Sequence, residues 1–273
     1  MLLKDYIPNT EKKFSKIFFS GISFESTKVK KNEIFFAIKG NKTDGNNFIS
    51  NAIKNGAKII VSEKKHKRQN NGIIYIQTKN VRKLLAEVSF KIYKKKPQNL
   101  IAVTGTNGKS SIADFYFQIL KLNNVKVASI GTLGVKSNNN NQNLSNTTID
   151  PLQLAKILQK LKNKKINNVI MEASSHGLKQ NRLDGIQFNS GIFTNLSQDH
   201  LDYHKNLNAY LKAKLYLFEK LVKKRGHVIT DDKIPEFKKI KKIASKRSLK
   251  INTIYEKNYK FQILSHSFKG EIQ

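Results

Sequence analysis

The chain contains no cysteine, which excludes disulfide bonds and metal sites built from thiolates. It also contains no apolar run that approaches the roughly 18 residues needed to cross a membrane as a helix, so we expect no membrane span. Residues 1–8 show no basic segment followed by an apolar core, which argues against a secretory signal. Together these absences predict a soluble protein of the cytoplasm.

Acidic residues are scarce: 19 Asp and Glu stand against 51 Lys and Arg, which gives a formal net charge of +32. Such a balance first suggests a nucleic-acid partner. The lysines, however, are spread along the whole chain, and the densest basic runs carry no interleaved aromatic residues on which bases could stack. These runs lie at residues 64–68, 94–96 and 238–242. We interpret them as solvated surfaces that favour small polyanionic substrates, and we expect no nucleic-acid partner.

The central feature of the sequence is an expected strand, loop and helix. The apolar run at residues 100–103 would form the strand, a loop with two glycines follows, and a helix-compatible stretch begins at Lys109. Gly105 and Gly108 would let the backbone approach a polyphosphate, and the loop N–H groups would supply positive potential. Lys109 would reach the terminal phosphates, and the Ser110 hydroxyl would complete a magnesium shell. The pattern is a shortened phosphate loop, since valine occupies the position of the first glycine in the general motif. The competing interpretation is an ordinary glycine turn before a helix.

With 273 residues the chain can form two domains, which we place at residues 1–95 and 96–273. The first is interpreted as a small α/β module in which Gly56 ends a helix. Residues 94–98 are interpreted as a linker, because charge repulsion and a proline disfavour a helix there. The expected elements of the first domain are strands at 34–38, 57–61 and 73–76 and helices at 48–53 and 81–93.

The second domain alternates strands and helices, which favours a mostly parallel sheet covered on both faces. The expected strands are 100–104, 125–130, 168–172, 188–194, 227–230 and 261–264, and the expected helices are 109–122, 151–162, 207–224 and 235–246. The polar residues 138–141 are expected to form an exposed loop. The predicted fold class is therefore α/β, with a small α/β domain followed by a P-loop domain.

Polar residues follow two of these strands, at 172–182 and 195–204, and both segments should face the phosphate loop, because ligands bind outside the carboxyl ends of parallel strands. Glu172 ends an apolar strand beside the expected nucleotide, where a carboxylate would bind magnesium. A surface glutamate is the alternative. The donors and the cation for an anionic substrate are Ser174, Ser175, His176, Gln180 and Arg182. For His200 and His204 the alternative is a plain polar loop residue.

Lys214 shares the apolar stripe of the expected helix 207–224, unlike the neighbouring lysines. The stripe consists of Leu211, Leu215, Phe218 and Val222, and the lysines off it are Lys212, Lys220 and Lys223. Gly226 would end this helix. Burial lowers the pKa of a lysine, and the neutral amine can react with carbon dioxide to give a carbamate, which is a metal-binding carboxylate. The alternative is a snorkelling lysine whose stem covers apolar surface.

Four motifs along the chain belong together. They are Thr-Gly-Thr-Asn-Gly-Lys-Ser-Ser at 104–111, Thr-Thr at 147–148, Met-Glu-Ala-Ser-Ser-His-Gly-Leu-x-Gln-x-Arg at 171–182 and Phe-Thr-Asn-Leu-Ser-Gln-Asp-His-Leu-Asp-Tyr-His at 193–204. This set resembles the Mur ligases of peptidoglycan synthesis and is most similar to the MurE type. The resemblance implies ATP-dependent amide-bond synthesis. The side-chain carboxylate of D-glutamate in UDP-N-acetylmuramoyl-L-Ala-D-Glu would attack the γ-phosphate of ATP, and the amine of a diamino acid, meso-diaminopimelate or L-lysine, would displace phosphate from the acyl phosphate.

The resemblance also implies roles for individual residues. ATP would be bound by Gly105, Thr106, Asn107, Gly108, Lys109, Ser110 and Ser111. One Mg²⁺ would be bound by Ser110 and Glu172, His200 would contact the metal site, and Lys214, as a carbamate, would bind a second Mg²⁺. The muramoyl dipeptide would be bound by Thr147, Thr148, Ser174, Gln180 and Arg182, and the uridine side by Ser26 and by Asn41 in the loop 40–45. The implied catalytic residues are Lys109, Glu172, His200 and Lys214.

The sequence departs from the family pattern in three places. Thr27 stands where the family has an arginine, and Thr230-Asp231-Asp232 stands where it has Asn-x-Asp-Asp, so we assign these aspartates no nucleotide role. The family's third domain, which binds the incoming amino acid, is missing, so we expect a monomeric fragment that is inactive alone and whose choice of diamino acid is open. Two other interpretations remain: another amide ligase of this superfamily, of the MurF or folylpolyglutamate synthetase type, and a basic P-loop protein that binds nucleic acid.

Overall fold

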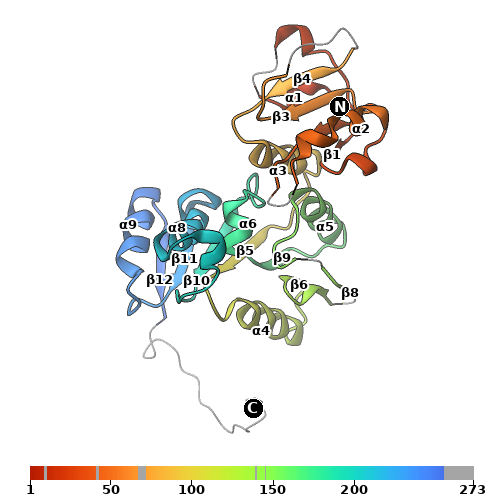
Figure 1. The fold of residues 1–273 in the computed structure, drawn as a ribbon. Helices are drawn as coiled ribbons and strands as arrows, with labels where there is room; N and C mark the ends of the chain where they lie inside the picture. Colours follow the sequence, from red (N-terminus) through yellow and green to blue (C-terminus); the bar gives the residue numbers. More distant parts are fainter. Residues whose placement is uncertain (9–10, 41–42, 67–71, 139, 145, 255–273) are drawn as a thin grey trace.

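The computed structural model describes residues 1–8, 11–40, 43–66, 72–138, 140–144 and 146–254, and two sheets organise this part of the chain (Figure 1). The smaller sheet is formed by residues 22–77 and the larger by residues 99–253. Asn41 and the strand expected at 261–264 lie outside the described residues. No helix in the described ranges is both long and apolar enough to cross a membrane.

The N-terminal unit, residues 1–93, is built on a parallel sheet with the strand order β1-β2-β3-β4. Its elements are β1 (Ile22–Ser23), β2 (Ile34–Phe36), β3 (Ile59–Ser62), β4 (Ile74–Gln77), α1 (Leu3–Tyr6), α2 (Ile49–Lys54) and α3 (Val81–Ile92), with 3-10 turns at Lys12–Phe14, Ser26–Lys28 and Gly45–Phe48. Side chains alternate across β2, so Phe36 joins the core under α1 and α3 while Phe35 joins the core under α2. Gly56 follows α2 with φ of +108°, as expected of a residue that ends a helix.

The second unit, residues 99–254, is built on a sheet with the order β12-β11-β10-β5-β9-β6-β7-β8. Its strands are β5 (Asn99–Thr104), β6 (Val127–Gly131), β7 (Gly134–Ser137), β8 (Asn140–Gln142), β9 (Asn168–Glu172), β10 (Phe188–Phe193), β11 (Val222–Thr230) and β12 (Lys250–Thr253). Its helices are α4 (Lys109–Leu122), α5 (Pro151–Asn163), α6 (Ser175–Lys179), α7 (Leu201–His204), α8 (Leu207–Tyr216), the π-helical turn η4 (Leu217–Leu221) and α9 (Phe237–Arg247). All neighbouring strands pair in parallel except β6 with β7 and β7 with β8.

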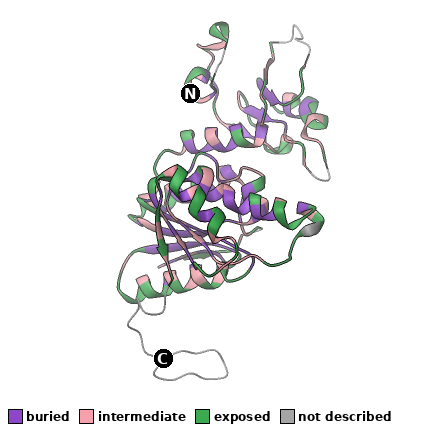
Figure 2. Ribbon diagram, turned by 90° about the vertical axis from the view of Figure 1, so that its left-hand side faces the viewer, coloured by how far each residue is buried: buried purple, intermediate pink, exposed green. Residues whose placement is uncertain are grey.

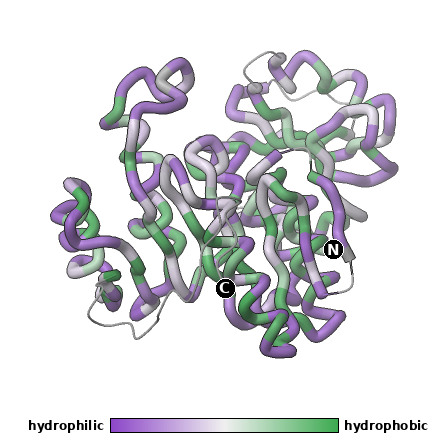
Figure 3. Tube along the Cα trace, turned by 90° about the horizontal axis from the view of Figure 1, so that it is seen from below, coloured by the Kyte–Doolittle hydropathy of each residue, from purple (hydrophilic) through white to green (hydrophobic). Residues whose placement is uncertain are grey.

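Helices cover both faces of the larger sheet. Along β5, Leu100 and Ala102 point into the core shared with α5, α8 and α9, whereas Val103 points into the smaller core under α4. Buried positions accordingly concentrate on the strands and on the inward sides of the helices (Figure 2). Hydrophobic stretches run along the interior strands and hydrophilic stretches dominate the periphery (Figure 3). The prediction of an α/β fold with a mostly parallel sheet is confirmed.

The helix predicted at 207–224 is too long. α8 stops at Tyr216, the π-helical turn η4 follows, and Val222 already begins β11. Gly226 therefore lies within β11 and does not end a helix. The apolar stripe runs through Phe218 to Val222 without a break in spacing, so periodicity could not show where the helix gives way to a strand.

The exposed loop expected at 138–141 is not what the structure shows at Asn140 and Asn141, which lie in a strand. Asn140 begins β8, which pairs antiparallel with β7 and places Asn140 opposite Ser137. β8 lies at the edge of the sheet, where polar residues are tolerated because one side of the strand has no neighbouring strand.

The two units meet where the start of α3 faces the residues that follow α6 (Figure 1). Asn80 Nδ2 donates to Asn181 Oδ1 at 3.0 Å, and Arg82 Nη1 donates to Gln180 Oε1 at 3.4 Å. Lys96, in the predicted linker, donates to the carbonyl of Gly185 at 3.0 Å. These hydrogen bonds hold the units together and define the space between them.

Candidate active site

The loop between β5 and α4 has the backbone that a phosphate site requires. Gly108 precedes α4 with φ of +80°, and a β-carbon on Gly105 would lie 1.8 Å from Thr194 Oγ1. Lys109 folds back over the loop, where its Nζ donates to Thr106 O at 2.6 Å and to Gly105 O at 3.1 Å. Burial lowers the pKa of Lys109. The predicted ATP-binding residues thus form one loop at the N-terminus of a 14-residue helix, with Ser110 and Ser111 in its first turn.

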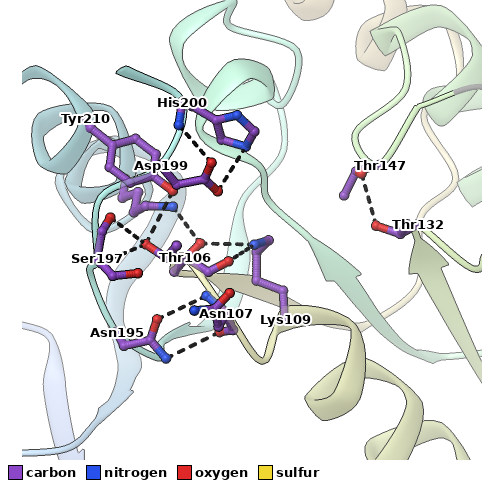
Figure 4. A network of polar contacts seen from close by, with 12 residues as sticks. Thr106, Asn107, Lys109, Thr132, Thr147, Asn195, Ser197, Asp199, His200 and Tyr210 are labelled. Carbon is purple, nitrogen blue, oxygen red and sulfur yellow. Dashed lines mark hydrogen bonds and ion pairs between the residues drawn. The ribbon is translucent and has the colours of Figure 1, made fainter. Parts of the chain in front are cut away.

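The segment after β10 holds this loop in place (Figure 4). Asn107 N donates to Asn195 Oδ1 at 3.0 Å, and Thr106 N donates to Asn195 O at 3.0 Å. Thr194 Oγ1 donates in turn to Asn107 O at 2.7 Å. The start of the segment 195–204 therefore faces the phosphate loop, as its place after a strand predicted.

We expect Gly105→Ala to destabilise the protein more than Gly108→Ala. Both glycines have positive φ, which costs a residue with a side chain about 1 kcal/mol. At Gly105 the added methyl group would also collide with Thr194, whereas at Gly108 the nearest atom, Thr194 Cγ2, is 4.0 Å away. Urea unfolding should therefore show a further loss of about 1–3 kcal/mol for Gly105→Ala. Equal losses in the two variants would contradict the close approach of the loop to Thr194.

Glu172 ends β9 against the start of α4 and the turn after β6. Its side chain is buried, Oε2 accepts from Ser110 Oγ at 3.0 Å and Thr132 Oγ1 at 3.2 Å, and Oε1 accepts from Thr132 N at 2.8 Å. A β-carbon on Gly131 would lie 2.1 Å from Oε1, so the carboxylate occupies space that this glycine leaves open. The alternative of a surface glutamate is wrong. The carboxylate and the two hydroxyl groups are hard oxygen donors, and they fit a Mg²⁺ ion.

Lys214 is buried, with 1 % of its surface exposed, as the helical spacing predicted. Its Nζ donates at 2.5 Å to Gly105 O, the carbonyl that also accepts from Lys109. The same Nζ lies 4.1 Å from the ring centre of Tyr210. Burial, followed by the charge of Lys109, lowers the pKa of Lys214 to about 7. The snorkelling alternative is wrong, because the amine itself lies inside the protein against the phosphate loop.

His200 and His204 differ in their surroundings. His204 is buried, neither ring nitrogen has a hydrogen-bond partner among the described residues, and burial lowers its pKa to about 4. His200 is exposed, with Nε2 3.4 Å from Asp199 Oδ2 (Figure 4). Both rings pack around His176, at 4.8 Å for His200 and 5.5 Å for His204. In the described ranges no three acidic or histidine side chains lie close enough to hold a metal ion, so the metal contact of His200 stays a prediction.

Thr147, Thr148 and Ser174, predicted to bind the dipeptide, lie beside Glu172. Thr147 Oγ1 is 3.0 Å from Thr132 Oγ1, at the margin of the Glu172 network (Figure 4). The buried Thr148 hydroxyl donates to the Glu172 carbonyl at 3.0 Å and accepts from Ser174 N at 3.0 Å, and the Ser174 hydroxyl caps α6. The Thr148 and Ser174 hydroxyls therefore shape the turn between β9 and α6. Substrate binding stays a prediction for all three.

A cavity of about 540 Å³ lies between the two units. Ser26 lines it from the N-terminal unit, and Gln180 and Arg182 line it from the second unit. The residue predicted to bind uridine and two residues predicted to bind the dipeptide thus meet in one space, although they come from different units. The cavity is large enough for part of an extended sugar nucleotide.

Three residues that the sequence did not single out belong to this region. Thr132 donates a hydrogen bond to Glu172 and directly follows β6. It could have been predicted from the sequence, because ligands bind beyond the carboxyl ends of parallel strands. Tyr210 OH lies 3.3 Å from Thr106 Oγ1, under the phosphate loop. Arg82 reaches the cavity from α3, and no signal separates it from the other basic residues of this strongly basic chain.

Two models of one protein family match the chain. The Mur ligase middle domain matches residues 103–272, and the Mur ligase family, catalytic domain, matches residues 19–93. This chain belongs to the Mur ligase family. The family predicted from the motifs is thereby confirmed for this Mur ligase.

Two relatives of this Mur ligase are both named UDP-N-acetylmuramoyl-L-alanyl-D-glutamate–2,6-diaminopimelate ligase. That of Rickettsia conorii is 40 % identical over 268 residues, which are 96 % of this chain and 56 % of the relative. That of Wigglesworthia glossinidia brevipalpis is 44 % identical over 229 residues, 81 % of this chain and 46 % of the relative. The chain therefore spans about half the length of the curated relatives it matches.

Solved structures agree with this placement. A structure of a UDP-N-acetylmuramoyl-L-alanyl-D-glutamate–2,6-diaminopimelate ligase matches with a TM-score of 0.79 and 30 % identity, over 93 % of this chain and 52 % of that one. A MurF ligase from Thermotoga maritima in complex with ADP matches with a TM-score of 0.54 and 19 % identity, over 84 % of this chain and 49 % of that one. At that identity the MurF match shows the shared fold alone.

Proposed function

We propose that this Mur ligase chain carries the ATP site and the acceptor site of a MurE-type enzyme, which joins a diamino acid to UDP-N-acetylmuramoyl-L-Ala-D-Glu. The observation that carries the proposal is that the phosphate loop, the buried Glu172 network and the cavity lined by Ser26 and Arg182 lie beyond the carboxyl ends of neighbouring strands of the larger sheet. The loop follows β5, Glu172 ends β9, and Arg182 follows α6. The names of the relatives favour 2,6-diaminopimelate as the amino acid, which we take to be the meso isomer, with L-lysine as the other choice. The reaction would take place in the cytoplasm, where ATP is supplied.

In the proposed reaction the side-chain carboxylate of D-glutamate attacks the γ-phosphorus of ATP, the bond to the β-phosphate oxygen breaks, and ADP leaves. The amine of the diamino acid then attacks the acyl carbon of the acyl phosphate, inorganic phosphate leaves, and the amine loses a proton. The protein's main task is to position the phosphates and to stabilise their charge. Lys109 and the N–H groups of the loop would do this from the N-terminus of α4.

Glu172 and Ser110 would hold a Mg²⁺ ion, which when bound neutralises phosphate charge. Lys214 would serve a second ion. Its amine nitrogen would attack the carbon of carbon dioxide and release a proton, leaving a carbamate whose oxygens are metal ligands. The burial of Lys214 and its lowered pKa of about 7 support this role, because the neutral amine is the form that reacts. His200 would contact the same metal site.

The two parts of the chain would divide the acceptor. Residues 1–95 would bind its uridine end through Ser26 and the loop of Asn41, and residues 96–273 would bind ATP and the dipeptide end. Thr147, Thr148, Ser174, Gln180 and Arg182 would bind the dipeptide end.

Calorimetric titration of the chain with UDP-N-acetylmuramoyl-L-Ala-D-Glu, and separately with an ATP analogue and Mg²⁺, tests the proposal. We expect both ligands to bind the unchanged chain. Lys109→Ala should lower the affinity for the ATP analogue by at least about tenfold, since it removes a charged contact worth about 1.5–3 kcal/mol. It should leave the affinity for the acceptor unchanged, because Lys109 lies in the phosphate loop and does not line the cavity.

The exposed Lys121, at the far end of α4, provides the matched control, and Lys121→Ala should bind both ligands as the unchanged chain does. If Lys109→Ala binds the ATP analogue as tightly as the unchanged chain does, residues 105–111 are not the ATP site. Binding of a folate or of a longer muramoyl peptide in place of the dipeptide would favour the folylpolyglutamate synthetase or MurF type instead.

A further inference from the structure

Arg82, in the first turn of α3, reaches from the N-terminal unit to the second unit. Its Nη2 donates to the Lys39 carbonyl at 2.9 Å within its own unit, and its Nη1 donates to Gln180 Oε1 at 3.4 Å across the boundary. The side chain also lines the cavity between the units. It is therefore placed to touch whatever occupies that cavity.

A second guanidinium converges on the same amide oxygen. Arg182 donates to Gln180 Oε1 through Nη2 at 2.8 Å and Nε at 3.1 Å, while its Nη1 donates to the Thr148 carbonyl. Within the described part of the chain, both arginines donate their hydrogen bonds to neutral oxygens. Two like charges thus share one uncharged acceptor.

This pairing is unfavourable as it stands. Burial lowers the pKa of both Arg82 and Arg182, and for Arg182 the charge of Arg82 adds to the effect. The charges of Glu63 near Arg82 and of Asp150 near Arg182 oppose this lowering without overcoming it. Partly buried cations need an anionic partner to offset the loss of hydration and their mutual repulsion. The arrangement is therefore most stable when an anion lies against both guanidiniums.

The two carboxylates that line the cavity make contacts of their own and hydrogen-bond neither arginine, although the charge of Asp150 acts on Arg182. Asp150 accepts from Gln153 N at 2.8 Å and so caps α5, and Glu25 pairs with Lys28 at 2.8 Å. The remaining lining is largely uncharged and includes the aromatic side chains of Phe24, Phe35 and Phe48. The anion that would complete the arginine pair is thus expected to come from a ligand.

We propose that Arg82 binds an oxyanion of the acceptor together with Arg182, the anion being either the diphosphate or a carboxylate of the sugar nucleotide. This inference rests on the proposed function and adds to it a residue from the N-terminal unit. Guanidinium groups suit this task because their fork of N–H donors matches phosphate and carboxylate oxygens. Because the two arginines belong to different units, the anion would bridge the units when it binds.

The test compares Arg82→Gln with the unchanged chain by calorimetry. Glutamine keeps N–H donors on a shorter side chain but removes the charge. We expect the affinity for UDP-N-acetylmuramoyl-L-Ala-D-Glu to fall by about 10- to 100-fold. Arg82→Lys should recover part of the loss, and the ATP analogue should bind all variants equally. Lys83→Ala, which removes an exposed charge from the next position of α3, should have no effect.

Two shorter ligands identify the anion. Uridine carries neither diphosphate nor carboxylate, so its affinity, followed by NMR, should be the same in Arg82→Gln and in the unchanged chain. If UDP loses as much affinity as the acceptor, the anion is the diphosphate. If UDP is unaffected while the acceptor is weakened, the anion is a carboxylate.

Equal affinity of Arg82→Gln and the unchanged chain for the acceptor would overturn the role of Arg82 and leave the proposed function standing. A loss in Arg82→Gln that extends equally to uridine would also overturn it, because the residue would then act on the shape of the cavity. If the unchanged chain does not bind the acceptor at all, the proposed function is wrong, and so is the role of Arg82.

Discussion

Lys214→Ala should lower the rate of amide-bond formation on the order of 10³-fold in a full-length Mur ligase that contains this chain. The expected cause is the loss of the carbamate, and with it a ligand of the second metal ion. Lys214→Met should lose as much activity while filling the space of the buried side chain. Lys212→Ala, at an exposed position of the same helix, should keep full activity. Rates are measured as phosphate release that depends on both the acceptor and the diamino acid.

Rescue by small carboxylates separates a chemical role of Lys214 from a structural one. Acetate or formate should partly restore Lys214→Ala, because the missing side chain leaves room for a free carboxylate at the phosphate loop. The same anions should not restore Lys214→Met, in which that room is filled. Absence of rescue in the alanine variant at every concentration would count against the carbamate.

The proposed carbamate at Lys214 predicts a pH dependence with a definite sign. A lysine with the ordinary pKa of 10.5 is neutral in only about one molecule in 3 × 10³ at pH 7, whereas a pKa of about 7 leaves about half neutral. The carbamate signal from ¹³C-labelled carbon dioxide should therefore fall as the pH drops below 7. The amine of Lys214 binds its proton more tightly in the unfolded chain than in the folded one. The contribution of Lys214 to the free energy of unfolding should therefore rise between about pH 7 and 10.5.

Glu172→Gln should weaken Mg²⁺-dependent binding of an ATP analogue by about 10²-fold. The amide oxygen can still accept from Thr132 N, and the amide nitrogen can still meet the Ser110 hydroxyl, so the fold around Gly131 should be kept. What is lost is the negative charge that a divalent cation requires. Titrations of the analogue with and without Mg²⁺ isolate this effect, because binding without the metal should barely change.

Glu11→Gln makes the same chemical change at an exposed ion pair with Lys13, a type of pair that contributes little to stability. It should bind the analogue as the unchanged chain does. Unfolding curves for Glu172→Gln and the unchanged chain should coincide within about 1 kcal/mol if the hydrogen bonds are preserved. A metal dependence that survives Glu172→Gln would show that the carboxylate does not serve the ion.

The sequence predicted those parts of the site that depend on local patterns. The strand, loop and helix around Lys109 follow from an apolar run, two glycines and helix-compatible spacing, and all three are present. The burial of Lys214 followed from its place between Leu211 and Phe218 on one stripe, because helical geometry decides which side chains share a face. The Mur ligase family could be predicted because the four motifs between residues 104 and 204 are specific for it when they occur together.

Other features depend on contacts that spacing does not encode. The end of α8 at Tyr216 is set by the pairing of Val222 with Phe188, a partner far away in the chain. Arg82 is one basic residue among many, and its importance comes from Arg182, which only the docking of the two units brings near. The burial of His204 likewise depends on the packing of α7 against α8.

The cavity that joins Ser26 to Arg182 bears on substrate choice, because its two ends belong to two different sheets. A ligand that contacts both ends links the two units, so its length must match the distance between the two sheets. A sugar nucleotide cut short would fill one end and leave the other unbridged. If the proposed function holds, precursors too short or too long to touch both ends should bind more weakly than the acceptor, even where every chemical group they carry is correct.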